Sequence, residues 1–227
     1  MSQTYNSYGR QMTQEEILSG AHRAWVGGMW DELGQLQLDF MMQNGLQPSH
    51  NLLDVGCGAL RGGLKFIEYL EPAKYFGIDI NESLIKAGMH ELELGRLTAK
   101  SPNLLVDDNF GFYRFDTKFD FAIAQSVFTH MPMNHIIRCL VNMSAVLKPE
   151  GVFFATYFEA PSSACLEPIS HVPGGIVTSF DKDPFHYSNE EFSWMAQTAG
   201  LSMVPIGDWG HPRDQRMLAF KVGTGRS

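Results

Sequence analysis

Cysteine and basic residues are scarce in this sequence, and each shortage excludes a class of protein. Three cysteines stand far apart among 227 residues, without a Cys-x-x-Cys pair, so the sequence predicts neither a disulfide framework nor a zinc site. The 17 lysines and arginines are outnumbered by 25 acidic residues, which leaves a net charge of −8. Because phosphate contacts from Lys and Arg carry much of the affinity for nucleic acid, we expect no nucleic-acid partner.

Long apolar runs are absent as well. No segment approaches the roughly 20 apolar residues that a membrane helix needs, and the first residues lack the charged and then apolar pattern of a secretory signal. Free thiols fit a reducing compartment. We therefore expect a cytoplasmic protein without a membrane partner. We also expect no metal, because no group of His, Asp and Glu has the spacing of a ligand set.

The most informative stretch that is present runs from residue 52 to 58, Leu-Leu-Asp-Val-Gly-Cys-Gly. An apolar strand ends there on an acidic residue and a glycine-rich turn. Gly56 and Gly58 allow a sharp turn and let the backbone approach a ligand without a Cβ in the way. A second apolar strand ends on Asp79, about 21 residues after Gly58, where an acidic residue can bind a ribose diol. The pattern predicts a nucleotide-type cofactor at these strand ends.

The spacing of the glycines separates two cofactors. The dinucleotide fingerprint G-x-G-x-x-G requires a third glycine at position 61, where this sequence has Arg61. The segment from Asp54 to Gly58, followed by Gly77-Ile-Asp79, resembles the first two motifs of class I S-adenosylmethionine-dependent methyltransferases. Two alternatives stay open. One is a nicotinamide-dependent oxidoreductase of the Rossmann type, and the other is a binding protein that keeps the cofactor fold without turnover.

Apolar strands alternate with amphipathic helices after residue 50, which predicts an α/β fold with helices on both faces of a mostly parallel sheet. With the resemblance, we expect a Rossmann-like sheet of seven strands that closes with an antiparallel hairpin. Residues 1–48 are expected to form an N-terminal helical cap or lid, and 49–227 one compact methyltransferase domain. We expect strands at 51–55, 75–79, 103–107, 119–124, 151–157, 201–206 and 215–222, and helices at 61–70, 81–95 and 133–147, with others from 13, over 29–44 and from 188.

S-adenosylmethionine is the cofactor that the resemblance implies, and it also implies where the cofactor binds. The first strand end and its glycines would hold the amino-acid part, and the second strand end would bind the ribose hydroxyls. The third strand end would meet the adenine, and the fourth would lie near the methionine portion. The implied cofactor-binding residues are Asp54, Gly56, Cys57, Gly58, Asp79, Ile80, Asp108, Asn109, Gln125 and Ser126.

Methyl transfer needs an aligned nucleophile and the exclusion of water. A hydroxyl or a protonated amine also needs a proton acceptor, for which histidine is the usual choice. The candidate catalytic residues are His130, which follows the fourth strand, and His211, in the connection of the final hairpin; packing or capping is the competing interpretation for both. Around them we expect a substrate-binding wall formed by Tyr8, Trp25, Tyr157, His171, His186, Trp209 and Arg213.

The fourth strand gives a hint about the acceptor. Methyltransferases that modify ring or amide nitrogens often carry Asn/Asp-Pro-Pro-Tyr after that strand, whereas this sequence has Gln125-Ser-Val-Phe128. The departure favours an oxygen, aliphatic nitrogen or carbon nucleophile on a small-molecule metabolite. Self-association into a homodimer is left open. We expect the roughly 28-residue loop after residue 158 to have no regular structure and to act as a lid or a binding loop.

Overall fold

The computed structural model describes residues 9–223, and these fall into two compact units, 9–108 and 109–223. The first unit joins the N-terminal helices to the first three strands. The second contains the remaining strands and helices. The expected boundary between a cap and a methyltransferase domain at residues 48 and 49 stays a prediction.

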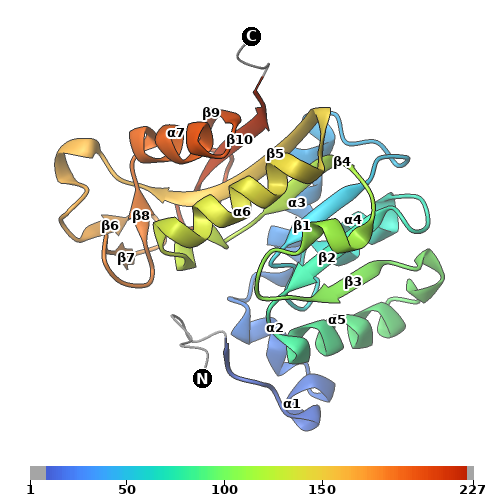
Figure 1. The fold of residues 1–227 in the computed structure, drawn as a ribbon. Helices are drawn as coiled ribbons and strands as arrows, with labels where there is room; N and C mark the ends of the chain where they lie inside the picture. The colour runs from blue at the N-terminus through green and yellow to red at the C-terminus, as the bar shows by residue number, and fades with distance from the viewer. Residues whose placement is uncertain (1–8, 224–227) are drawn as a thin grey trace. The chain divides into compact units, whose positions relative to one another are not determined.

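Three parallel strands form the sheet of the first unit, with β2 between β1 and β3 (Figure 1). All residues of β1 and β2 are buried, which fits strands covered on both faces. The crossover helix α5 packs against β2 and β3, and α4 packs against β2. The elements are α1 (Gln14–Leu18), α2 (Ala21–Trp25), α3 (Trp30–Gln43), β1 (Leu52–Val55), α4 (Gly63–Tyr69), β2 (Tyr75–Asp79), α5 (Glu82–Leu94) and β3 (Asn103–Val106).

The capping signals at the N-terminus are confirmed. Thr13 and Glu16 form a reciprocal capping box at the start of α1, and Gly45 follows α3 with a φ of 97°, as a glycine after a helix end should. The short helix α2 was not expected. It arises because Gly20, with a φ of 76°, ends the first helical segment and lets the chain start another.

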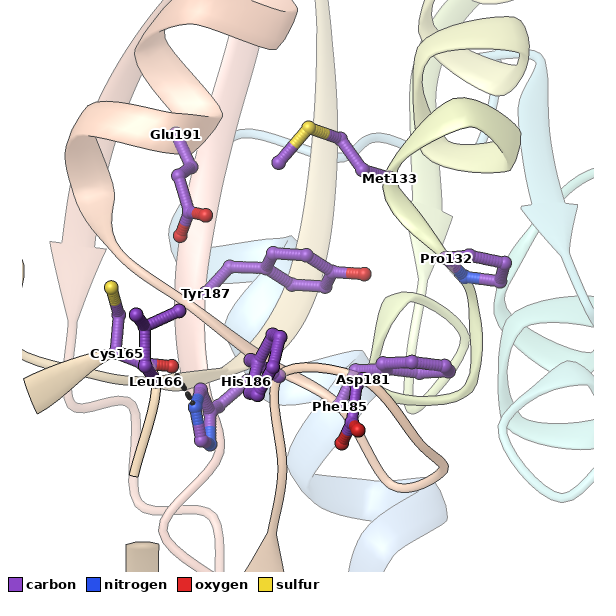
Figure 2. A pocket seen from close by; sticks show the side chains of 10 residues that line it. Pro132, Met133, Cys165, Leu166, Asp181, Phe185, His186, Tyr187 and Glu191 are labelled. Atoms are coloured by element: carbon purple, nitrogen blue, oxygen red, sulfur yellow. Dashed lines mark hydrogen bonds between the residues drawn. The ribbon is translucent and has the colours of Figure 1, made fainter. Parts of the chain in front are cut away.

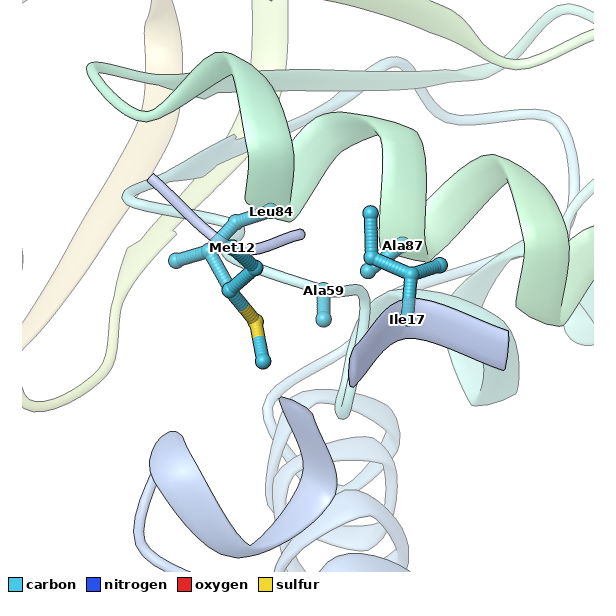
Figure 3. Close-up of a cluster of buried hydrophobic side chains, with 5 residues drawn as sticks. All are labelled: Met12, Ile17, Ala59, Leu84 and Ala87. Carbon is cyan, nitrogen blue, oxygen red and sulfur yellow. The ribbon is translucent and has the colours of Figure 1, made fainter. Parts of the chain in front are cut away.

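A small apolar cluster joins the N-terminal segment to the rest of the first unit (Figure 3). Met12 and Ile17 pack there on Ala59 of the glycine loop and on Leu84 and Ala87 of α5. Burying each of the two larger side chains contributes about 1.5–3 kcal/mol. The N-terminal segment is thus part of the core next to the glycine loop.

The second unit carries four strands in the order β4-β5-β10-β9, with β4 parallel and β10 antiparallel to β5 (Figure 1). The expected closing hairpin of β9 and β10 is confirmed. The elements are β4 (Phe119–Ala124), α6 (Met133–Val146), β5 (Leu147–Glu159), β6 (Ile169–His171), β7 (Ile176–Thr178), β8 (His186–Tyr187), α7 (Asn189–Thr198), β9 (Leu201–Gly207) and β10 (Arg216–Val222).

The expected α/β fold, with a mostly parallel sheet and a closing antiparallel hairpin, is confirmed, and two details differ. The long loop after residue 158 has regular structure, because β6 and β7 form an antiparallel hairpin within it. The count of seven strands is also one too low. The short strand β8 pairs in parallel with the end of β5, so eight strands pair in the sheet that the described residues form. The error has one cause, since strands of two or three residues leave no alternation to detect.

Candidate functional site

The loop after β1 has the backbone shape that its glycines predict. Gly56 and Gly58 have φ values of 69° and 54°, in the left-handed region that favours glycine. The N–H groups of Gly56 and Cys57 both donate to the carbonyl of Ile78 on β2, at 2.8 and 3.1 Å. The loop therefore folds back over the end of the neighbouring strand, and its glycines expose backbone on the outer side.

Asp79, at the end of β2, holds this loop in place. One carboxylate oxygen accepts from the Gly58 N–H at 2.8 Å, and the other accepts from the Asn81 N–H at 2.8 Å. Burial raises the pKa of Asp79, while these backbone donors act in the opposite direction. The backbone N–H of Ile80 is a third donor to this carboxylate. Two oxygens offer about four acceptor positions, so the carboxylate can still accept from a ligand hydroxyl.

Asp54 is buried beneath the loop and carries the most perturbed carboxyl of the site. Its Oδ2 accepts from the hydroxyl of Tyr75 at 2.7 Å. Burial is the main cause that raises the pKa of Asp54 to about 7, and the charge of Asp79 adds to it; the Tyr75 hydrogen bond and Arg61 act in the other direction. A buried carboxyl that is half ionised near neutral pH gains most from a cationic partner.

Arg61, which stands where a dinucleotide loop has glycine, fixes the N-terminal segment to the loop. Its Nη1 donates to the carbonyls of Val26 and Gly28, at 2.9 and 3.1 Å. Helix α3 packs closely on the same stretch: a Cβ on Gly34 would lie 2.6 Å from the Arg61 carbonyl oxygen. A Cβ on Gly58 would have Val26 as its nearest neighbour at 3.8 Å. Residues 26–28 therefore lie next to the glycine loop.

A buried ion pair fixes the same N-terminal segment to α5. Glu91 accepts two hydrogen bonds from Arg23, at 2.7 and 2.6 Å, and one from His22 Nε2 at 2.7 Å. Burial opposes the charge of Glu91, but these hydrogen bonds outweigh it, so the pKa of Glu91 lies below its usual value. Within the described residues, His22 Nδ1 is a buried atom without a partner.

The other cofactor-site residues of the first unit differ in exposure. The Cys57 side chain is buried, and a Cβ on Gly77 would lie 2.9 Å from its Sγ, so only the Cys57 backbone faces outward. Ile80 is 55% exposed directly after a fully buried strand. Asp108 is exposed after β3, and Trp25 packs against the cluster of Figure 3. Tyr8 lies outside the described residues.

In the second unit, Gln125, Ser126 and His211 belong to one hydrogen-bonded group, which we call the glutamine cluster together with Thr156 and Gln215. Ser126 Oγ donates to Gln215 Oε1 at 2.9 Å, and the Ser126 N–H donates to Thr156 Oγ1 at 2.7 Å. Gln125 Nε2 lies 2.7 Å from Ser126 Oγ and 3.2 Å from His211 Nε2. The cluster joins the ends of β4, β5 and the β9–β10 connection.

The two candidate catalytic histidines lie in different surroundings. His211 is buried in the glutamine cluster and stacks on Trp209 with ring centroids 5.5 Å apart. His130 is partly exposed, and its Nδ1 pairs with the carboxylate of Asp183. A carboxylate partner fixes the tautomer and orientation of an imidazole, as a general base requires. Asn109, the last cofactor candidate, is exposed and accepts from Arg138.

His171 and His186 lie in a chain of hydrogen bonds that we call the histidine relay. Thr178 Oγ1 lies 2.9 Å from His171 Nε2 and 2.7 Å from His186 Nδ1, and His186 Nε2 lies 2.8 Å from the Cys165 carbonyl. A carbonyl only accepts, so Nε2 of a neutral His186 carries the proton and Thr178 donates to its Nδ1. Thr178 in turn accepts from His171. Burial lowers the pKa of His171.

The remaining candidates for substrate binding make contacts within the protein. Tyr157 is buried and donates to Asn189 Oδ1 at 2.8 Å. The indole N–H of Trp209 donates to the Gln215 carbonyl at 2.9 Å. Arg213 is half-buried, and a Cβ on Gly174 would lie 2.7 Å from its Cα, so the loop after β6 approaches it closely. Their role in binding a substrate stays a prediction.

Several residues that build these arrangements were not anticipated. Tyr75 is the hydrogen-bond donor to Asp54, and Thr156 and Gln215 complete the glutamine cluster. Asp183 and Thr178 orient the histidines. The only available signal was a polar residue inside an otherwise apolar run, as Thr156 is in Val-Phe-Phe-Ala-Thr-Tyr-Phe.

Two further features are absent from residues 9–223. No helix there is long and apolar enough to cross a membrane. In the same residues, no group of three or more His, Cys, Asp or Glu side chains is placed to hold a metal ion.

The chain is similar to known methyltransferases in sequence and in fold. Residues 53–153 match the model of a methyltransferase domain. The ubiquinone/menaquinone biosynthesis C-methyltransferase UbiE of Dinoroseobacter shibae is 25% identical over an alignment of 206 positions that covers 83% of this chain and 77% of that protein. A solved S-adenosylmethionine-dependent methyltransferase of Clostridium acetobutylicum has a TM-score of 0.67 at 11% identity, over 93% of this chain and 100% of the other.

Magnesium protoporphyrin IX methyltransferase of Synechocystis, solved with bound S-adenosylhomocysteine, has a TM-score of 0.59 at 15% identity and covers 94% of this chain and 89% of its own. At such identities the likeness to solved structures shows a shared fold. The matched domain begins on the strand that leads into the glycine loop. Residues 53–153 therefore carry a match to a methyltransferase domain, and the fold is similar to that of solved S-adenosylmethionine-dependent methyltransferases.

Proposed function

We propose that the protein transfers the methyl group of S-adenosylmethionine to an oxygen, nitrogen or carbon nucleophile of a small-molecule metabolite. The observation that carries this proposal is the glycine loop of the first unit, which lies between two buried acidic strand ends, Asp54 and Asp79. The domain match favours this proposal over a nicotinamide-dependent oxidoreductase, and a turnover assay separates it from a cofactor-binding protein without activity.

The residues of the first unit fit this cofactor. Asp54, with its pKa raised to about 7 by burial, is suited to the cationic α-amino group. Asp79 accepts from three backbone N–H groups and keeps acceptor capacity for the ribose hydroxyls. The exposed Ile80 offers an apolar surface for the adenine ring. When bound, the cofactor supplies a methyl group that its sulfonium already makes electrophilic, so the chain has to align the acceptor and exclude water.

For the proton acceptor we propose His130 or His211. The Asp183 carboxylate supports His130, because it can stabilise the imidazolium that forms when a nucleophile loses its proton. His211 is the second candidate because it lies in the glutamine cluster, next to the ends of β4 and β5. A carbon acceptor stays within the proposal, since the Dinoroseobacter relative is named a C-methyltransferase. The free cysteines favour a reducing compartment, and we propose the cytoplasm.

Calorimetry with S-adenosylhomocysteine and with NAD tests the cofactor. Wild-type protein should bind the first and not the second. Asp79→Asn removes the charge-assisted hydrogen bonds to the ribose and should weaken S-adenosylhomocysteine binding about ten-fold or more. Glu93→Gln, a neutralised carboxyl exposed on α5, is the matched control and should bind as the wild type does. Binding of NAD alone, or wild-type affinity in Asp79→Asn, would contradict the proposal.

A further inference from the structure

A cavity of about 380 Å³ lies within the second unit, between the start of α6, the start of α7 and the segment that carries β6 to β8. Figure 2 shows it from close by. Its volume falls in the range of small-molecule sites, about 300–1,000 Å³. The residues that line it are Pro132, Met133, Cys165, Leu166, Phe180, Asp181, Phe185, His186, Tyr187 and Glu191.

The fold places this cavity at the ligand-binding edge of the second unit. Helices α6 and α7 both begin after parallel strands end: α6 follows β4, and α7 follows β8, which pairs in parallel with the end of β5. In an open α/β sheet, ligands bind outside the carboxyl ends of the strands. Pro132 and Glu191 come from the first turns of these two helices and bring their ends to the cavity.

The walls are mainly apolar and are exposed where a ligand would cover them. Leu166 is 66% and Phe180 50% exposed, although both are large apolar side chains that are stable when buried. Tyr187 and Phe185 form the inner wall with stacked rings, and Met133 adds a flexible side chain (Figure 2). Such a lining suits an apolar ring.

Hydrogen bonds hold the walls in a preformed shape. The Tyr187 hydroxyl donates to the Met131 carbonyl at 2.6 Å, and the Phe185 N–H donates to the Thr129 carbonyl at 2.7 Å. The end of the histidine relay reaches the cavity, where His186 holds the Cys165 carbonyl, as the dashed line in Figure 2 marks. A cavity with anchored walls costs little ordering when a ligand binds.

The charged residues of the lining favour a ligand with a positive charge. Asp181 and Glu191 are the ionisable acids of the lining, and its ten residues include neither lysine nor arginine. Glu191 uses one oxygen to accept from the Ser188 N–H, whereas Asp181 is exposed at the rim. An anionic ligand would be repelled, and a cationic amine would be attracted.

We infer that this cavity is the acceptor pocket and that it binds an apolar ring compound carrying a basic amine. That the ligand is the methyl acceptor rests on the proposed function. The chemistry of the ligand rests on the lining of the cavity. The ring lies against Tyr187 and Phe185, and the ammonium group lies toward Asp181.

Tryptamine and indole-3-acetate test the charge preference, because they carry the same ring with opposite charges. With roughly 12 non-hydrogen atoms, tryptamine should bind with a millimolar to high-micromolar Kd in ligand-observed NMR titrations. Indole-3-acetate should bind at least about five-fold more weakly. Equal or tighter binding of indole-3-acetate, or no tryptamine binding up to about 10 mM, would overturn the inference.

Matched variants locate the binding. Leu166→Trp fills the cavity from an exposed position and should abolish tryptamine binding, whereas Val177→Trp, equally exposed on β7 and outside the lining, should leave it unchanged. Asp181→Asn should weaken it about two- to five-fold, as an exposed charge pair does. The control is Glu167→Gln, an exposed carboxyl next to the wall that does not line the cavity. Tryptamine binding that survives Leu166→Trp places the site elsewhere and refutes the assignment.

Calorimetry with S-adenosylhomocysteine on the same samples separates the two proposals. If S-adenosylhomocysteine binds and tryptamine does not, the pocket assignment is wrong and the proposed function stands. If tryptamine binds in the cavity and S-adenosylhomocysteine does not bind, the ligand chemistry stands and the cofactor proposal is wrong.

Discussion

Replacing Asp54 with asparagine should remove most of the pH dependence that the glycine loop gives to folding. Burial raises the pKa of Asp54 from 3.8 to about 7, a shift of about three units, or about 4 kcal/mol at about 1.36 kcal/mol per unit. Since the folded-state pKa is the higher one, the stabilisation is fully present below pH 4. It is lost as the pH rises from about 4 to about 7.

Urea unfolding between pH 5 and pH 7 measures this effect. Over that interval the free energy of unfolding of the wild type should fall by about 2 kcal/mol relative to that of Asp54→Asn. Tyr75→Phe is the useful companion, because it removes the hydroxyl that donates to Asp54 and so raises the pKa of Asp54 further. The stability of Tyr75→Phe should therefore begin to fall at the same low pH as that of the wild type and keep falling to a higher pH.

The same ionisation should control cofactor affinity. A cationic amino group gains from an ionised Asp54, so the affinity of the wild type for S-adenosylhomocysteine should rise up to about pH 7, and Asp54→Asn should show weaker and flat binding. If the free energy of unfolding changed with pH by the same amount in wild type and Asp54→Asn, the reasoning would be refuted, because Asp54 would then carry no shifted pKa.

Three further predictions concern packing and hydrogen bonds. Gly63→Ala places a Cβ 2.5 Å from the Tyr75 hydroxyl and should destabilise the protein by about 1–3 kcal/mol in urea unfolding; a loss under about 0.5 kcal/mol would mean that the ring moves freely. His211→Gln keeps a polar contact to Gln125 and should lower turnover far more than the affinity for S-adenosylhomocysteine. Unchanged turnover would mean that His211 only packs. Thr178→Val keeps the shape and leaves two buried imidazole nitrogens unpaired, so unfolding should become about 1–3 kcal/mol easier; an unchanged midpoint would argue against the histidine relay.

The strands and helices of the sheet could be predicted because their signals are local. The boundaries at Asp54 and Asp79 follow from an apolar run that meets a polar residue and a turn. The helix starts at Thr13 and Ser188 follow from capping boxes. In each of these cases the residues that determine the boundary lie within a few positions of it, so a single sequence contains the whole argument.

The hairpin of β6 and β7 could not be predicted in the same way. Its strands, Ile169–His171 and Ile176–Thr178, have three residues each, which is too short to show alternation. Pro173 and the two glycines after it indicate a turn. They do not reveal which residues pair on either side, because that pairing depends on packing with distant segments.

In the candidate site, too, residues of a local motif could be predicted and residues that act over long sequence separations could not. The loop residues from Asp54 to Gly58 form one motif and were found together. Tyr75 and Gln215 were missed because each acts on a partner 21 to 89 positions away in the sequence. Hydrogen bonds across such separations are set by the three-dimensional fold, and composition and spacing carry no record of them.

The anchoring of the first thirty described residues has a practical consequence for anyone who shortens this protein. A version that starts at residue 49 would retain the glycine loop but remove both Arg23 and His22, which hydrogen-bond Glu91 on α5. It would also leave the Arg61 guanidinium without two carbonyl acceptors. It would also remove Met12 and Ile17, whose burial beside the loop contributes about 1.5–3 kcal/mol each. Trimming the chain to begin at residue 49 would therefore weaken the very loop that the trimmed protein was made to display.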